Sequence, residues 1–116
     1  MKERKNNNKT SFHLKLLLNI INIEEYPFTK LVIEKNLSNE EYNQLFELLN
    51  ELDQTYQVQK KEGLLDFSSL LVHFAGMLNE KLSPTETIKA LRKEGLFESL
   101  MSEFISIIQN KDPHVK

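Results

Sequence analysis

The chain has 116 residues, of which 40% are hydrophobic and 28% charged, so it can bury one core and is too apolar for a disordered protein. It contains no cysteine, which excludes disulfide bonds and thiolate metal sites and favours the cytoplasm. The net charge of −2 hides an asymmetry, because residues 1–9 carry four basic side chains and one acidic one while the remainder is acidic. An acidic body does not favour binding to nucleic-acid phosphates.

The first residues predict a polar arm followed by a very apolar helix. Residues 1–10 include three consecutive asparagines, so we predict a disordered basic arm there. A first helix is expected from about Phe12 to Ile23, and its apolar residues extend round more than one face, so it must be covered on several sides. One stripe, expected to face the core, contains Leu14, Leu17, Leu18 and Ile21, and an overlapping face contains Leu16, Ile20 and Ile23.

The same apolar run raises the question of a signal peptide. Lys15, Asn19 and Asn22 interrupt it, and acidic residues follow where a small-residue cleavage site would be needed. No uninterrupted apolar stretch is long enough to span a membrane. We therefore expect neither a signal peptide nor a membrane span.

Helix start and stop signals divide the next part of the chain. Pro27 suits the first turn of a second helix, and Asn36 can take the left-handed conformation that ends it. Ser38 and Glu41 have the spacing of a capping box for a third helix. That helix should end near Gly63, in a Schellman motif.

A fourth helix is expected to begin with Asp66 as its N-cap, with Leu65 and Leu70 forming a hydrophobic staple. Gly76 lies inside this helix, and a glycine there costs about 1 kcal/mol relative to alanine. The simplest reason for keeping it is a close helix crossing. We therefore predict that another helix passes close to Gly76.

Similar signals define the last two helices. Ser83 and Glu86 have the spacing of a second capping box, and Gly95 repeats the stop signal seen at Gly63. A sixth helix uses the apolar residues Phe97, Leu100, Met101, Phe104, Ile105 and Ile108. The sequence thus predicts an all-α fold, an irregular multihelical bundle of five to six helices in a single domain over residues 11–110, followed by a disordered tail over 111–116.

Candidate catalytic and metal-binding residues are few. Neither His13 nor His73 has a second metal ligand three or four positions later, and zinc needs three or four converging ligands. Ser68, Ser69 and His73 could share a helix face as a nucleophile and base, but serine and histidine come this close on helix surfaces by chance. We expect no catalytic residue, no cofactor and no metal.

The last two helices have the outline of a helix-turn-helix. The second of them carries Glu98 and Glu103, and no lysine or arginine before Lys111. A helix that reads DNA normally brings arginine, lysine, asparagine or glutamine to the base edges. We therefore expect no nucleic-acid binding by this helix, and only the basic arm is a candidate for it.

Several blocks of the chain resemble a known family. They are Tyr26-Pro27-Phe28, Leu37-Ser38 with Glu40-Glu41, Phe74-Ala75-Gly76 with Leu78 to Leu82, Glu86-Thr87-Ile88 with Ala90-Leu91, Gly95-Leu96, and Leu100-Met101 with Phe104-Ile105. Between about Leu14 and Ile108 the chain is similar to the YhaI-like proteins of bacilli, which are small, multihelical and of unknown function. The resemblance implies no activity. It does draw attention to Asn79, Glu80 and Lys81 as a possible functional corner, although we favour the interpretation of a hydrogen-bonded structural corner.

The sequence favours association over catalysis. Our leading interpretation is a cytoplasmic, non-enzymatic protein that acts by self-association, as a dimer or trimer, or by binding an unidentified protein partner. The candidate interface consists of Leu16, Ile20, Ile23 and Ile107. The alternative arrangement is a central first helix wrapped by the other five. A nucleic-acid-associated regulator that uses the basic arm is the second interpretation. A small enzyme is the third, and a polar pocket around His73 would favour it.

Overall fold

The computed structural model describes the backbone of residues 2–111 and the side chains of residues 8–110. Of the tail predicted over 111–116, all but the backbone of Lys111 lies outside the described residues. The predicted all-α fold is confirmed, since the described part contains α-helices, one short 3-10 helix and no strand. The elements are α1 (Lys2–Ile20), η1 (Ile23–Glu25), α2 (Pro27–Glu34), α3 (Asn39–Lys61), α4 (Ser68–Met77), α5 (Pro84–Lys93) and α6 (Glu98–Lys111).

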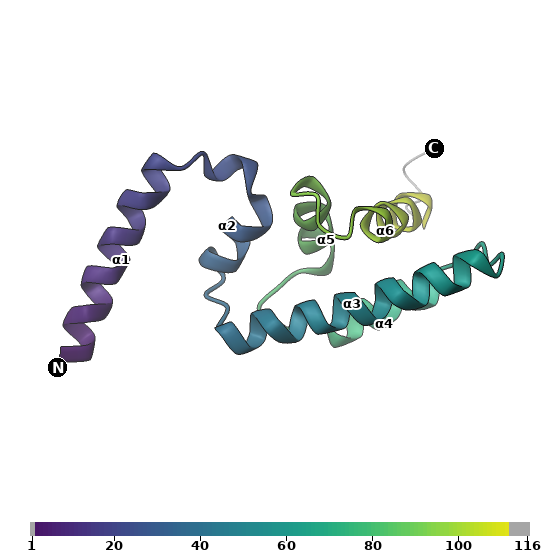
Figure 1. The fold of residues 1–116 in the computed structure, drawn as a ribbon, viewed down its shortest axis with the longest axis horizontal. Coiled ribbons are helices and arrows are strands. Elements are labelled where there is room, and N and C mark those ends of the chain that lie inside the picture. The colour runs from purple at the N-terminus through teal and green to yellow at the C-terminus, as the bar shows by residue number, and fades with distance from the viewer. Residues whose placement is uncertain (1, 112–116) are drawn as a thin grey trace.

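The bundle is built on the long helix α3. In Figure 1, α3 runs along the base, α4 returns alongside it, and α5 and α6 lie above them. Helix α2 packs against α5, and α5 packs against α6. One continuous core lies between these helices, and α1 contributes no residue to it. Its most deeply buried apolar members are Phe28, Leu49, Phe74, Ile88, Leu91, Leu100, Met101 and Phe104.

Three predicted helix ends are confirmed. Asn36, Gly63 and Gly95 have φ values of 57°, 89° and 84°, which is the left-handed conformation that ends a helix. After α3, the N–H of Leu64 donates to the carbonyl of Gln59 at 3.0 Å, which is the long hydrogen bond of a Schellman motif. These ends fix the directions in which the chain leaves α2, α3 and α5.

Two predicted helix starts are not formed as expected. Asp66 is not the N-cap of α4, which begins at Ser68, although its carboxylate accepts the Ser68 N–H at 2.9 Å. Leu65 is 91% exposed, so it forms no staple.

The second capping box is also absent, because the Ser83 side chain makes no cap hydrogen bond. The ψ of Ser83 is 131°, whereas that of Ser38, which does form a box, is 166°.

The predicted close crossing at Gly76 is wrong. A Cβ atom built on this residue would meet no heavy atom within 4 Å, and Gly76 is exposed. It lies in the last turn of α4, on a face that no other described helix covers. The sequence pattern identified a helical glycine correctly but could not tell which side of α4 faces the core.

Helix α2 is capped by a residue far away in sequence. Its own N-cap residue, Tyr26, makes no side-chain cap bond. Instead, Glu94 at the end of α5 accepts the N–H groups of Phe28 at 2.9 Å and Thr29 at 3.0 Å, and its second oxygen accepts the Thr29 hydroxyl at 2.9 Å. A carboxylate at a helix N-terminus satisfies free N–H groups and interacts favourably with the helix dipole. Glu94 therefore ties α2 to α5.

We expect Glu94→Ala to lower the free energy of unfolding by about 1–3 kcal/mol, because it leaves these N–H groups without their charged acceptor. Urea unfolding followed by circular dichroism measures the change. Glu80→Ala is the control, since Glu80 is exposed in the turn before α5. Equal stabilities of the two variants would show that the Glu94 cap contributes nothing.

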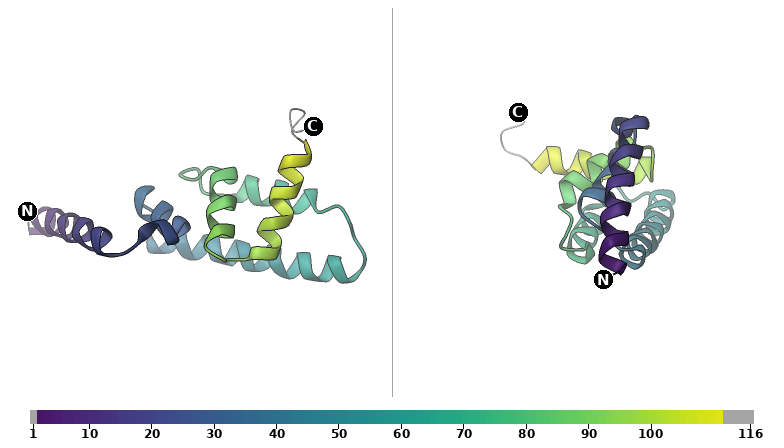
Figure 2. Two further views of the ribbon diagram at one scale, coloured as in Figure 1. Left: turned by 90° about the horizontal axis from the view of Figure 1, so that it is seen from above. Right: turned by 90° about the vertical axis from the view of Figure 1, so that its left-hand side faces the viewer.

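Helix α1 leaves the bundle. It projects from one end of the molecule in Figure 1 and in the left view of Figure 2. The radius of gyration is accordingly 17.1 Å, against about 13 Å for a compact domain of this length. The helix begins at Lys2, earlier than the predicted start near Phe12, and ends at Ile20 rather than Ile23.

The structure therefore has helix through residues 2–10, where the sequence predicts a disordered arm. Lysine, arginine and glutamate are good helix formers, and each residue added to an existing helix gains one hydrogen bond. Disorder of the arm in solution stays a prediction.

Candidate functional site

A run of exposed apolar residues lies along the second half of α1 and includes Ile21, which directly follows the helix. We call them the α1 apolar surface: Phe12, Leu14, Leu16, Leu17, Ile20 and Ile21, of which Ile20 is 79% and Leu16 46% exposed. One expectation and one alternative from the sequence are therefore wrong. The stripe of Leu14, Leu17, Leu18 and Ile21 does not face the core, and α1 is not a central helix wrapped by the others. Within the described residues, the broad apolar face of α1 has no cover.

The four residues predicted as an interface do not all lie together. Leu16 and Ile20 are neighbours on the α1 apolar surface. Ile23 is half-buried in η1, beside the start of α2. Ile107 is half-buried against the core from α6, at the other end of the molecule from α1. The structure therefore leaves Leu16 and Ile20 as the interface candidates that share a surface.

The corner around Asn79 is a hydrogen-bonded network centred on Glu41. The predicted capping box of α3 is confirmed, because the Glu41 N–H donates to the Ser38 hydroxyl at 3.0 Å and the Glu41 carboxylate accepts the Ser38 N–H at 2.9 Å. The same carboxylate accepts the Asn79 amide at 3.1 Å and the Lys81 ammonium at 2.8 Å. Glu80 is exposed. Asn79 and Lys81 thus join the start of α3 to the α4–α5 turn.

The network makes Glu41 a stable anion. The hydrogen bond from Lys81, followed by that from the Ser38 backbone, lowers the pKa of Glu41 from 4.5 to about 2. Such a carboxylate is too weakly basic to take a proton at neutral pH. It acts as a structural anchor, a fixed negative charge that holds Ser38, Asn79 and Lys81 in place.

This anchor gives the fold a pH dependence. Because the pKa of Glu41 is lower in the folded chain, the ionised group stabilises the fold above about pH 4.5, and that stabilisation is lost as the pH falls towards 2. Glu41→Gln should therefore unfold at lower urea concentration than the native chain at pH 7, and the difference should shrink at pH 3. Glu40→Gln, on the exposed neighbour, is the control. A constant difference between Glu41→Gln and the native chain at both pH values would contradict this assignment.

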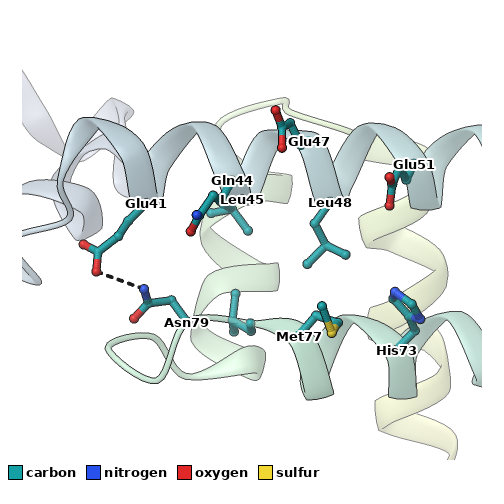
Figure 3. Close-up of a pocket in the computed structure, with 10 residues that line it drawn as sticks. Glu41, Gln44, Leu45, Glu47, Leu48, Glu51, His73, Met77 and Asn79 are labelled. Carbon is teal, nitrogen blue, oxygen red and sulfur yellow. Dashed lines mark hydrogen bonds between the residues drawn. The ribbon is translucent and has the colours of Figure 1, made fainter.

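A groove of about 410 Å³ lies between α3 and α4. Figure 3 shows Leu48 on α3 facing Met77 on α4, with Leu45 deeper between the helices. The Glu41–Asn79 hydrogen bond closes one end, and Glu51 and His73 face each other towards the other. The groove therefore has apolar walls and a polar rim.

The rim of the groove is acidic. Glu47 and Glu51 line it together with Glu41, and no lysine or arginine does. Only Glu41 has an ion-pair partner among these three within residues 8–110. The sequence did not reveal the groove, because Glu47 and Glu51 have the pattern of a solvated helix face. Only the pairing of α3 with α4 makes them part of a groove that Met77 and His73 also line.

The groove does not combine the residues proposed for catalysis. His73 lines it, but Ser68 and Ser69 do not. Among the described residues, no group of three or more histidine, aspartate or glutamate side chains is arranged to hold a metal ion. The groove can receive the apolar side chains of a segment whose flanking residues carry positive charge.

Two further findings concern the protein as a whole. No helix in the part of the chain that the structure describes is long and apolar enough to cross a membrane. A family model described as "Protein of unknown function (DUF1878)" matches residues 1–109, which is almost the whole length of the chain. The chain therefore belongs to this family of proteins of unknown function.

Proposed function

We propose that this chain is a cytoplasmic, non-enzymatic protein that works by self-association, as a dimer or trimer, through α1. The observation that carries the proposal is the uncovered α1 apolar surface. Large exposed apolar patches on folded proteins are typical of protein interfaces. Symmetric homo-oligomers are the commonest way in which soluble proteins cover such a patch.

The energetics of α1 support the same proposal. Most helix stability in proteins comes from packing of an apolar face rather than from helix propensity. Helix α1 has 19 residues, and none of its apolar side chains packs against the core of its own chain. Burial of these side chains would contribute roughly 25 cal/mol per Å² of apolar area. A second copy can therefore stabilise α1 and the assembly together.

The alternatives rest on fewer residues. Nucleic-acid binding would use the basic residues of the arm, and it gives no role to the apolar surface that follows them. Catalysis would use the groove around His73, whose lining contains no serine, threonine or lysine to act as a nucleophile. Within the family, we place the chain with the YhaI-like proteins of bacilli, on the strength of the Phe74–Leu82 block.

Light scattering tests the proposal. At micromolar concentration the full chain should have at least twice its mass of 13.6 kDa, whereas a chain lacking residues 1–21 should be monomeric and still helical by circular dichroism. A monomeric full chain would overturn the proposal. If that monomer also bound DNA or RNA with a strong salt dependence, the nucleic-acid alternative would take its place.

A further inference from the structure

We infer that α1 of one copy docks into the α3–α4 groove of a second copy. The inference rests on the proposed self-association and identifies the surface that receives α1. It joins the two features of the molecule that have no use within one chain: a projecting apolar helix and an open groove with apolar walls.

Charge is the first argument. Between Arg4 and Asn22 the chain contains basic residues, among them Lys9, and no acidic one. The groove rim has the opposite sign, since Glu47 and Glu51 line it and no basic residue does. Opposite potentials of this kind steer partners together and fix their orientation. Two α1 helices packed against each other would instead bring like charges together.

Shape is the second argument. The apolar stretch of α1 from Phe12 to Ile20 has an axial length of about 12 Å, and the groove extends for about 15 Å along α3 between Glu41 and Glu51. The apolar face of α1 is also very broad. A single partner helix covers a narrow seam, whereas the two walls of a groove cover a helix on two sides. The α3–α4 groove therefore suits this helix better than a second α1 does.

The groove walls offer suitable contacts. Met77 is 65% exposed and faces Leu48 across the groove. Methionine adapts its shape to a docked apolar side chain and is common at protein-binding surfaces. The Glu41–Asn79–Lys81 network holds one end of the groove in place. At the other end, Glu51 has no ion-pair partner within residues 8–110 and is available to a lysine of the incoming helix.

Disulfide trapping tests the docking. Because the chain has no cysteine of its own, only the introduced cysteines can form a disulfide. One chain carries Met77→Cys, and a second chain, with a mass tag, carries Leu17→Cys or Ile20→Cys. After mild oxidation of the mixture we expect the disulfide between the two different chains. Because each chain has a single cysteine, any disulfide joins two copies.

Two controls sharpen the result. Val72→Cys lies on an exposed part of α4 that does not line the groove, and Lys15→Cys lies on the polar side of α1. Val72→Cys should trap at least tenfold less product than Met77→Cys. Lys15→Cys should trap at least tenfold less than Leu17→Cys or Ile20→Cys. If chains with a cysteine on α1 form disulfides only with each other, the docking is overturned in favour of α1–α1 pairing. Equal trapping at Val72→Cys and Met77→Cys would also overturn it.

Charge reversal provides an independent readout. Glu47→Lys combined with Glu51→Lys should weaken self-association at least roughly tenfold at low salt, and Lys9→Glu should restore part of the loss. If the oligomer persists in these variants and Met77→Cys traps no disulfide, the docking is contradicted but the proposed self-association is not. A monomeric native chain contradicts both.

Discussion

Leu49→Ala is expected to lower the free energy of unfolding by about 2–5 kcal/mol, which is a large part of the stability of a domain of this size. Leu49 lies in the middle of α3 and has no exposed surface. It belongs to the core shared by α2 to α6, so its truncation removes buried apolar area and leaves a cavity that a helix packed on several sides cannot fill. Thermal unfolding should show a midpoint lowered by roughly 10 °C or more.

Leu65→Ala is the matched control, because it removes the same atoms from a side chain that is 91% exposed. Its effect should stay within about 0.5 kcal/mol. Equal losses at the two positions would show that the core is not where the structure places it.

Leu16→Glu combined with Ile20→Glu is expected to weaken self-association by at least about a thousandfold. Docking would place both carboxylates in an apolar contact, and burial of an unpaired charge costs several kcal/mol, while each 1.4 kcal/mol corresponds to a factor of ten. Sedimentation across a dilution series measures the change. The fold itself should persist, because α1 contributes nothing to the core.

Leu65→Glu is the control for this pair, since Leu65 is more exposed than either residue and lies outside α1. It should leave the mass unchanged. An oligomer that survives Leu16→Glu with Ile20→Glu would place the contact elsewhere on the molecule.

The features that the sequence predicted well are local ones. The left-handed ends at Asn36, Gly63 and Gly95 depend on hydrogen bonds within a single helix turn, and so does the capping box of Ser38 and Glu41. Residue type and spacing are sufficient for such features. The apolar residues of the sixth helix were predicted for the same reason, because periodicity identifies the face that must be buried, and all six lie in the core or against it.

The features that it missed depend on the partner of each helix. Gly76 faces open space, which no pattern within α4 indicates. Glu94 caps α2 from 66 residues away from Phe28. The acidic groove exists only because α3 pairs with α4. The pattern of α1 predicted that several sides of this helix must be covered, but the same pattern fits a central helix and a helix that docks on another molecule.

Hydrogen exchange at several protein concentrations tests most directly the claim that α1 is covered by a second copy. Amides within residues 12–20 should gain protection as the concentration rises, whereas those around Leu49 in α3 should be protected throughout. The coupling follows because α1 does not pack against the core of its own chain, and a helix whose apolar face is not packed opens readily. Amides of α1 that exchange at one rate, fast or slow, at every concentration would contradict the account.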